Sequence, residues 1–109
     1  MVSNVLEVQI LSEAERPGGL LFRARVVRDG VERATAVHLH WADYNLWAPD
    51  GALPPERVAN AVIRVYADHC GFENLPDSFD AAQLRRRWPE ADDRVFDLVV
   101  GRAPRDATS

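Results

Sequence analysis

Residues 20–41, LLFRARVVRDGVERATAVHLHW, decide the fold of this 109-residue chain. Apolar side chains alternate with other side chains on both sides of Asp29-Gly30, a dipeptide that strongly predicts a two-residue hairpin turn because both of its residues tolerate positive φ. A turn at this point places Phe22 opposite Val37 and gathers the apolar side chains of both strands on one face. A slip of one residue would separate them, so turn chemistry and hydrophobic pattern independently predict the same antiparallel hairpin.

The residues before the hairpin predict another strand. Leu6, Val8 and Ile10 alternate with polar residues, as expected of a strand with one buried face. Residues 12–19 contain turn formers and no alternation, and they predict a loop that returns the chain antiparallel. Together with the hairpin, this segment predicts a three-stranded antiparallel meander.

The second half of the sequence shows helical spacing. Residues 42–53 predict a short helical turn, opened by Asp43, and then a loop. Longer helical patterns follow, with their own start and end signals: a helix from Pro54 or Pro55 to Cys70, a short helix capped by Ser78 or Asp80 and ending at Arg87, and a last helix from Pro89 to Gly101. Strands followed by helices predict an α+β fold, in which two or three helices pack on the apolar face of the meander.

Length, charge and cysteine content narrow the class of protein. The length predicts a single domain over residues 1–101, followed by a frayed tail over residues 102–109. The formal net charge of -4 argues against a dedicated binder of nucleic-acid phosphates. A single cysteine, the lack of a signal-peptide pattern and the lack of a long apolar run predict a cytoplasmic protein with no membrane partner.

A succession of short motifs resembles a group of small bacterial α+β proteins. The motifs are Val37-His38-Leu39, Asp43-Tyr44, Pro55-Glu56, Ser78-Phe79-Asp80 and Trp88-Pro89-Glu90. The match covers roughly the last two thirds of the chain. The resemblance implies the fold and a bacterial origin, and it carries over no catalytic residue.

The sharpest chemical feature is the His38-Leu39-His40 motif. Two histidines at this spacing on a strand point to the same face, about 7 Å apart along it, so both rings can reach one metal ion. For a further zinc ligand the sequence offers, without a recognisable spacing, His69, Cys70, Asp43 or Glu7. The alternative is a solvated face shared with Arg23 and Arg25, where a cation is repelled. That alternative is favoured, so neither a metal nor a cofactor is predicted.

Other reactive side chains have simpler interpretations. Asp43 and Tyr44, at the end of the predicted strand beside the two histidines, are candidates for a polar pocket, although a role in capping and packing is favoured. Cys70 follows Asp68 and His69 on a predicted helix, where neighbouring side chains point in different directions. A structural thiol is therefore favoured over a nucleophile.

A basic run supplies candidate partner contacts. It consists of Arg85, Arg86 and Arg87 at the end of the predicted short helix. The acidic residues of segment 90–93 follow at once and would cancel its field. A solvated helix end or a salt-bridged link to that acidic segment is therefore favoured over contact with nucleic acid.

The tryptophans are the other candidate contacts. Trp47 and Trp88 lie at the ends of predicted elements, where an indole either closes the core or anchors a partner. Trp41 is expected in the core, because the hairpin register places it on the buried face.

Two hypotheses of function follow. The first is a non-catalytic protein-interaction or regulatory module in a bacterial cytoplasm, which associates with a protein partner or a second copy through an open sheet edge or an apolar patch. The alternative is a metal- or small-ligand-binding protein or enzyme, whose side chains would have to converge on one concave pocket. Its candidate residues are His38, His40, Arg23, Arg25, Asp43 and Tyr44. Nucleic-acid binding by the Arg and His face ranks last.

Overall fold

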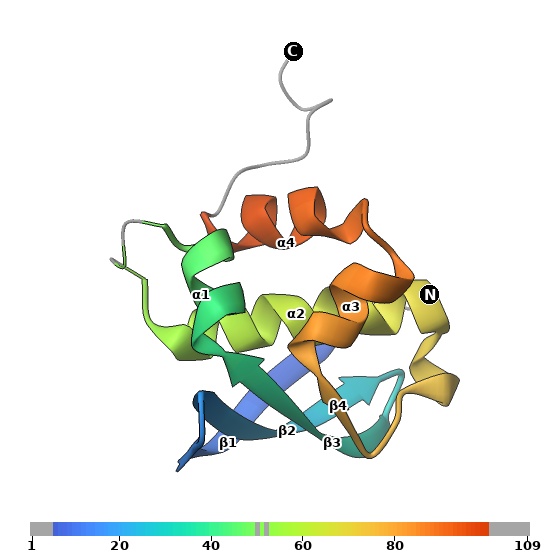
Figure 1. Ribbon diagram of the computed structural model, residues 1–109. Helices are drawn as coiled ribbons and strands as arrows, with labels where there is room; N and C mark the ends of the chain where they lie inside the picture. The colour runs from blue at the N-terminus through green and yellow to red at the C-terminus, as the bar shows by residue number, and fades with distance from the viewer. Residues whose placement is uncertain (1–5, 50, 52, 101–109) are drawn as a thin grey trace.

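The computed structural model describes residues 6–49, 51 and 53–100, and their elements confirm the α+β class (Figure 1). The strands are β1 (Glu7–Arg16), β2 (Gly19–Arg28), β3 (Val31–His40) and β4 (Ser78–Asp80). The helices are α1 (Trp41–Trp47), α2 (Pro55–Cys70), α3 (Ala81–Arg87) and α4 (Ala91–Val99), with a 3-10 turn at Phe72–Asn74. The sheet order is β1-β2-β3-β4, with the first three strands antiparallel and β4 parallel to β3.

The hairpin forms in the predicted register. Phe22 lies opposite Val37, and the ladder continues without a shift to the pair formed by Arg28 and Val31. Asp29 has φ 51° and Gly30 has φ 81°, the two positive values that a type I′ turn requires. Turn chemistry and the apolar pattern were therefore sufficient to determine this part of the sheet.

The predicted loop over residues 12–19 is wrong, because β1 continues to Arg16 and turns through Pro17 and Gly18. The register shifts by one residue between Ile10 and Ser12, so Leu11 is a β-bulge. A bulge moves the following side chains to the opposite faces of the strand. The apolar alternation of residues 6–10 is lost beyond it, although the backbone stays paired.

The fourth strand was also missed. Ser78–Asp80 pairs with Ala36–His38, and the chain then enters α3 at once, with Asp80 as the predicted N-cap. The sheet therefore has four strands rather than three, and four α-helices are described rather than two or three. A strand of three residues is too short for alternation to show, and its partner lies about forty positions earlier in the sequence.

The helices cover one face of the sheet and leave the other face bare (Figure 1). Phe22, Val37 and Leu39 are buried between the sheet and the helices, whereas the side chains of Arg23 and Arg25 lie on the bare face. Trp41 is not in the core as expected but 44% exposed. The strand ends at His40 and the helix begins at Trp41, so the strand alternation no longer applies there.

Two predictions concern the C-terminal end of the chain and its relation to a membrane. The last described helix ends at Val99, and both Gly101 and the predicted tail over residues 102–109 lie outside the described residues. None of the described helices combines the length and apolar character needed to cross a membrane.

Candidate metal centre

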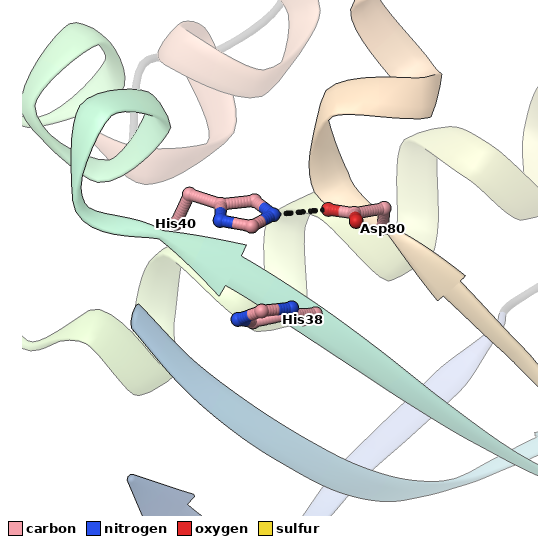
Figure 2. A group of neighbouring side chains, drawn as sticks. All are labelled: His38, His40 and Asp80. Carbon is pink, nitrogen blue, oxygen red and sulfur yellow. Dashed lines mark hydrogen bonds and ion pairs between the residues drawn. The ribbon is translucent and has the colours of Figure 1, made fainter. Parts of the chain in front are cut away.

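His38, His40 and Asp80 come together on the bare face of the sheet, and we call these three residues the His–Asp cluster. One ligand atom from each lies within 4.8 Å of the others. The Nε2 atom of His40 and the Oδ1 atom of Asp80 are 2.7 Å apart, and the two imidazole rings have centroids 4.0 Å apart. Figure 2 shows the His40 ring facing the Asp80 carboxylate across the gap between the end of β3 and the start of α3, with the His38 ring beside them.

The sheet register explains this convergence. His38 and His40 are two positions apart on β3 and therefore share a face, as predicted. The parallel ladder places Asp80 beside His38 on that same face. Asp80 is also held from the helix side, because it forms a capping box with Gln83 in which the Asp80 N–H donates to Gln83 Oε1 at 3.0 Å.

The turn between β1 and β2 packs closely against the backbone of β3 at Leu39 and His40. Gly19 is the ladder partner of His40, and a Cβ atom at Gly19 would lie 2.2 Å from the Leu39 carbonyl oxygen. The Trp41 N–H donates to the Gly18 carbonyl oxygen at 2.9 Å. Only glycine permits this close approach, so the turn fixes the point where β3 ends and α1 begins.

We expect the Gly19→Ala substitution to lower the free energy of unfolding by about 3 kcal/mol, because the new methyl group would displace the β3 backbone. Urea unfolding followed by circular dichroism measures the change. The Gly30→Ala substitution is the control, since its Cβ meets nothing within 4 Å and costs only the strain of its positive φ, about 1 kcal/mol. Equal losses in the two variants would contradict the close approach at Gly19.

One atom of the cluster lacks a partner. The Nε2 atom of His38 is buried, and it forms no hydrogen bond with any described residue. A buried polar atom without a partner costs free energy, so a native structure that contains one calls for an explanation. A metal ion bound at this nitrogen would be such an explanation, because imidazole nitrogen is a common ligand.

The further ligands suggested by the sequence lie elsewhere. His69 is on α2, where Nδ1 contacts the Val65 carbonyl oxygen at 3.0 Å and the ring packs on Trp88. Burial raises the pKa of the Cys70 thiol, as expected of a structural thiol rather than a nucleophile. Among the described residues, Asp80 is the acidic side chain that lies near the two histidines. The sequence position of Asp80, directly before a helix, indicates only a capping role, and the parallel pairing of β4 with β3 is what places its carboxylate beside the histidines.

The two arginines of the bare face do not join the cluster. Arg25 forms an ion pair with Glu32 at 3.3 Å and donates a hydrogen bond to Gln9 at 3.0 Å. Arg23 is exposed and lies opposite Ala36. The repulsion between these arginines and a cation on the same face is therefore reduced, because Glu32 balances the charge of Arg25.

Asp43 and Tyr44 are not part of the histidine face. Asp43 is 4% exposed and pairs with Arg85 at 3.0 Å, while the Tyr44 hydroxyl donates to the Leu53 carbonyl oxygen. Both side chains therefore pack and connect elements rather than line a shared pocket with the histidines. The candidate polar pocket that would have combined them with His38 and His40 is not formed.

The arginine run divides into three different environments. Arg85 bridges Asp43 and Asp92, which confirms the predicted link to the acidic segment. Desolvation alone would lower the pKa of Arg85, but the hydrogen bond to Asp43 and the charge of Asp92 outweigh it and raise the pKa. Arg87 donates to the Tyr66 hydroxyl at 3.1 Å and lies over the Trp88 ring. Arg86 is exposed.

The two tryptophans offered as partner contacts belong mainly to the interior. Trp47 is 1% exposed, and its Nε1–H donates to Asp92 at 3.3 Å. Trp88 is partly buried and packs edge-on against Tyr66. Neither residue therefore provides the large exposed indole surface that typically anchors a partner.

A scan against protein-family models, a search of curated proteins and a search of solved structures each found no match to this chain. Function must therefore be inferred from the geometry and chemistry of the site.

Proposed function

We propose that this protein binds a divalent first-row transition-metal ion through His38, His40 and Asp80. The observation that carries the proposal is the convergence of two imidazoles and one carboxylate within 4.8 Å. Two histidines and a carboxylate form a ligand set that proteins use for zinc and for ferrous iron. This is the metal-binding alternative from the sequence, with Asp80 as the ligand that the sequence did not identify.

The distances between the donors suit an ion after a small adjustment. In a tetrahedral site with bonds of about 2.0 Å, neighbouring ligand atoms lie about 3.3 Å apart. The Nε2 atom of His40 and the Oδ1 atom of Asp80 are 2.7 Å apart and would move slightly further apart. The ligand atoms with the largest separation, at most 4.8 Å, would move closer together. Changes in side-chain torsion angles can supply such movements because the two side chains are 35% and 38% exposed.

Calorimetric titration of chelator-treated protein with zinc chloride tests the proposal. We expect one ion per chain, and we expect His38→Ala and Asp80→Asn each to weaken binding at least about tenfold, because each removes a ligand. Asparagine is itself a good N-cap, so Asp80→Asn removes the anionic ligand while preserving the start of α3. A parallel titration with ferrous iron under argon shows which ion the site prefers.

The His69→Ala substitution is the matched control, because it removes the remaining histidine from α2 and should leave the zinc affinity unchanged. Absence of binding by the unmodified chain, or equal weakening by His69→Ala and His38→Ala, would refute the proposed site.

Two expectations from the sequence stay predictions beside this proposal: a cytoplasmic location and association with a protein partner or a second copy. One feature of β1 bears on the second. The bulge at Leu11 and the charged side chains of this edge strand, such as Glu7 and Glu13, are features that discourage pairing of sheet edges. A partner is therefore better sought on another surface than along the β1 edge.

A further inference from the structure

An open surface pocket of about 360 Å³ adjoins the His–Asp cluster, and we call it the β4–α3 cavity. His38 and Asp80 form part of its wall, so a molecule in the cavity would lie beside an ion held by the cluster. The remaining polar wall consists of Ser78, Gln83 and Arg86, which come from β4 and α3. The cavity therefore combines two proposed metal ligands with three groups that can donate hydrogen bonds.

Arg86 is the cationic group of this wall. Among the described residues, no hydrogen bond or ion pair involves its side chain, whereas Arg85 and Arg87 on either side are held by Asp43, Asp92 and Tyr66. A guanidinium group presents a planar fork of donors that matches two oxygens of a phosphate. The structure thus leaves Arg86 available to an anion in the cavity.

Gln83 and Ser78 extend the donor set. The Oε1 atom of Gln83 accepts the Asp80 N–H, so the side-chain amide nitrogen remains as the donor. The Ser78 hydroxyl lies on the strand that also carries Asp80. Guanidinium, amide and hydroxyl donors around one cavity suit the several acceptor oxygens of a tetrahedral anion better than the two of a carboxylate.

The charge balance makes the metal ion necessary for such an anion. Without an ion, the positive charge of Arg86 is opposed by the carboxylate of Asp80 in the same wall. A divalent ion on the cluster would reverse that balance, because a bound cation is often the largest local charge in a site. Three protein ligands would also leave a coordination position for an exogenous oxygen, as in catalytic zinc sites.

We propose that a phosphate group, free or as a monoester, binds in the β4–α3 cavity between the metal ion and Arg86. This inference rests on the proposed metal-binding function and names the ligand class of that same site. The metal would hold one phosphate oxygen, while Arg86 would hold others through charge-assisted hydrogen bonds.

The experiment uses the full chain loaded with cobalt(II), whose unpaired electrons broaden the phosphorus NMR signal of nearby phosphate. Inorganic phosphate is titrated at a cobalt concentration that saturates each variant. We expect saturable broadening, a dissociation constant raised at least about tenfold by Arg86→Ala, and partial recovery in Arg86→Lys, which keeps the charge but not the fork. Arg57→Ala removes an exposed arginine from α2 and should leave the constant unchanged.

The outcomes separate the two proposals. Failure of cobalt to bind at the cluster refutes the metal site, whereas cobalt binding without phosphate binding refutes this inference alone. Equal constants for the unmodified chain and Arg86→Ala would also overturn it. So would equal phosphate binding by metal-free protein in a calorimetric titration, or acetate that displaces phosphate as effectively as phosphate itself binds. Phenyl phosphate distinguishes the two sources: tighter binding than inorganic phosphate supports a monoester, and equal or weaker binding supports free phosphate.

Discussion

The Trp47→Ala substitution is expected to lower the free energy of unfolding by about 3–5 kcal/mol, the usual cost of removing a large aromatic side chain from a core. Trp47 is 1% exposed at the end of α1, and its indole N–H donates to Asp92 of α4. The substitution would therefore leave a cavity and also remove a link between two helices. For a chain of this length such a loss is a large part of the total stability. Urea unfolding with fluorescence and circular dichroism as probes measures it.

Trp41→Ala is the matched control, because Trp41 begins the same helix but is 44% exposed. Its ring meets only the edge of Tyr44 among aromatic neighbours in the described residues, so we expect a loss of about 1 kcal/mol. A larger loss for Trp41→Ala than for Trp47→Ala would mean that the interior has been assigned to the wrong tryptophan.

The Arg85→Met substitution should lower the free energy of unfolding by about 2–4 kcal/mol. Arg85 is the ion-pair partner of Asp43, whose side chain is only 6% exposed, and it also reaches Asp92 at 3.3 Å. Removing the guanidinium would leave a buried carboxylate without its counter-charge, which costs more than the ion pair itself contributes. The partial exposure of Arg85 places the expected loss below the maximum for a fully buried pair.

Arg86→Met provides the control for this effect. It removes the same charge one residue further along α3, where the side chain is exposed, and the expected change is within about 0.5 kcal/mol. The variant with both Asp43→Asn and Arg85→Met should lose less free energy of unfolding than the sum of the two single losses. In the double variant, neither a buried carboxylate nor a guanidinium is left without its counter-charge. Additive losses would show that the two side chains do not act as a pair.

The meander shows how far the sequence could predict the fold. Its central hairpin depends on the turn formed by Asp29 and Gly30 and on alternation, both of which are local properties of residues 20–40. The prediction was wrong where a local pattern was interrupted. The bulge at Leu11 hid the second half of β1, and the end of the strand at His40 moved Trp41 out of the predicted core.

The candidate site was also predicted only in part: the two histidines were identified and the carboxylate was not. The shared face of His38 and His40 follows from strand geometry alone. Asp80 could not be identified, because it reaches the histidines only through the pairing of β3 with β4, which joins segments separated by residues 41–77. Residue type and spacing carry no signal for such a long-range contact, and the capping role of Asp80 already explained its position before α3.

The parallel edge strand also has a consequence for the order in which the molecule assembles. The contacts among β1, β2 and β3 join neighbouring segments through two-residue turns, so closing them costs little chain entropy. β4 pairs with β3 across the long intervening segment that contains α1 and α2, so closing this contact costs more chain entropy. We therefore expect the two imidazoles to be positioned early, by local contacts, and the carboxylate late, by a distant one. Fraying of a three-residue edge would separate them again while leaving the meander intact.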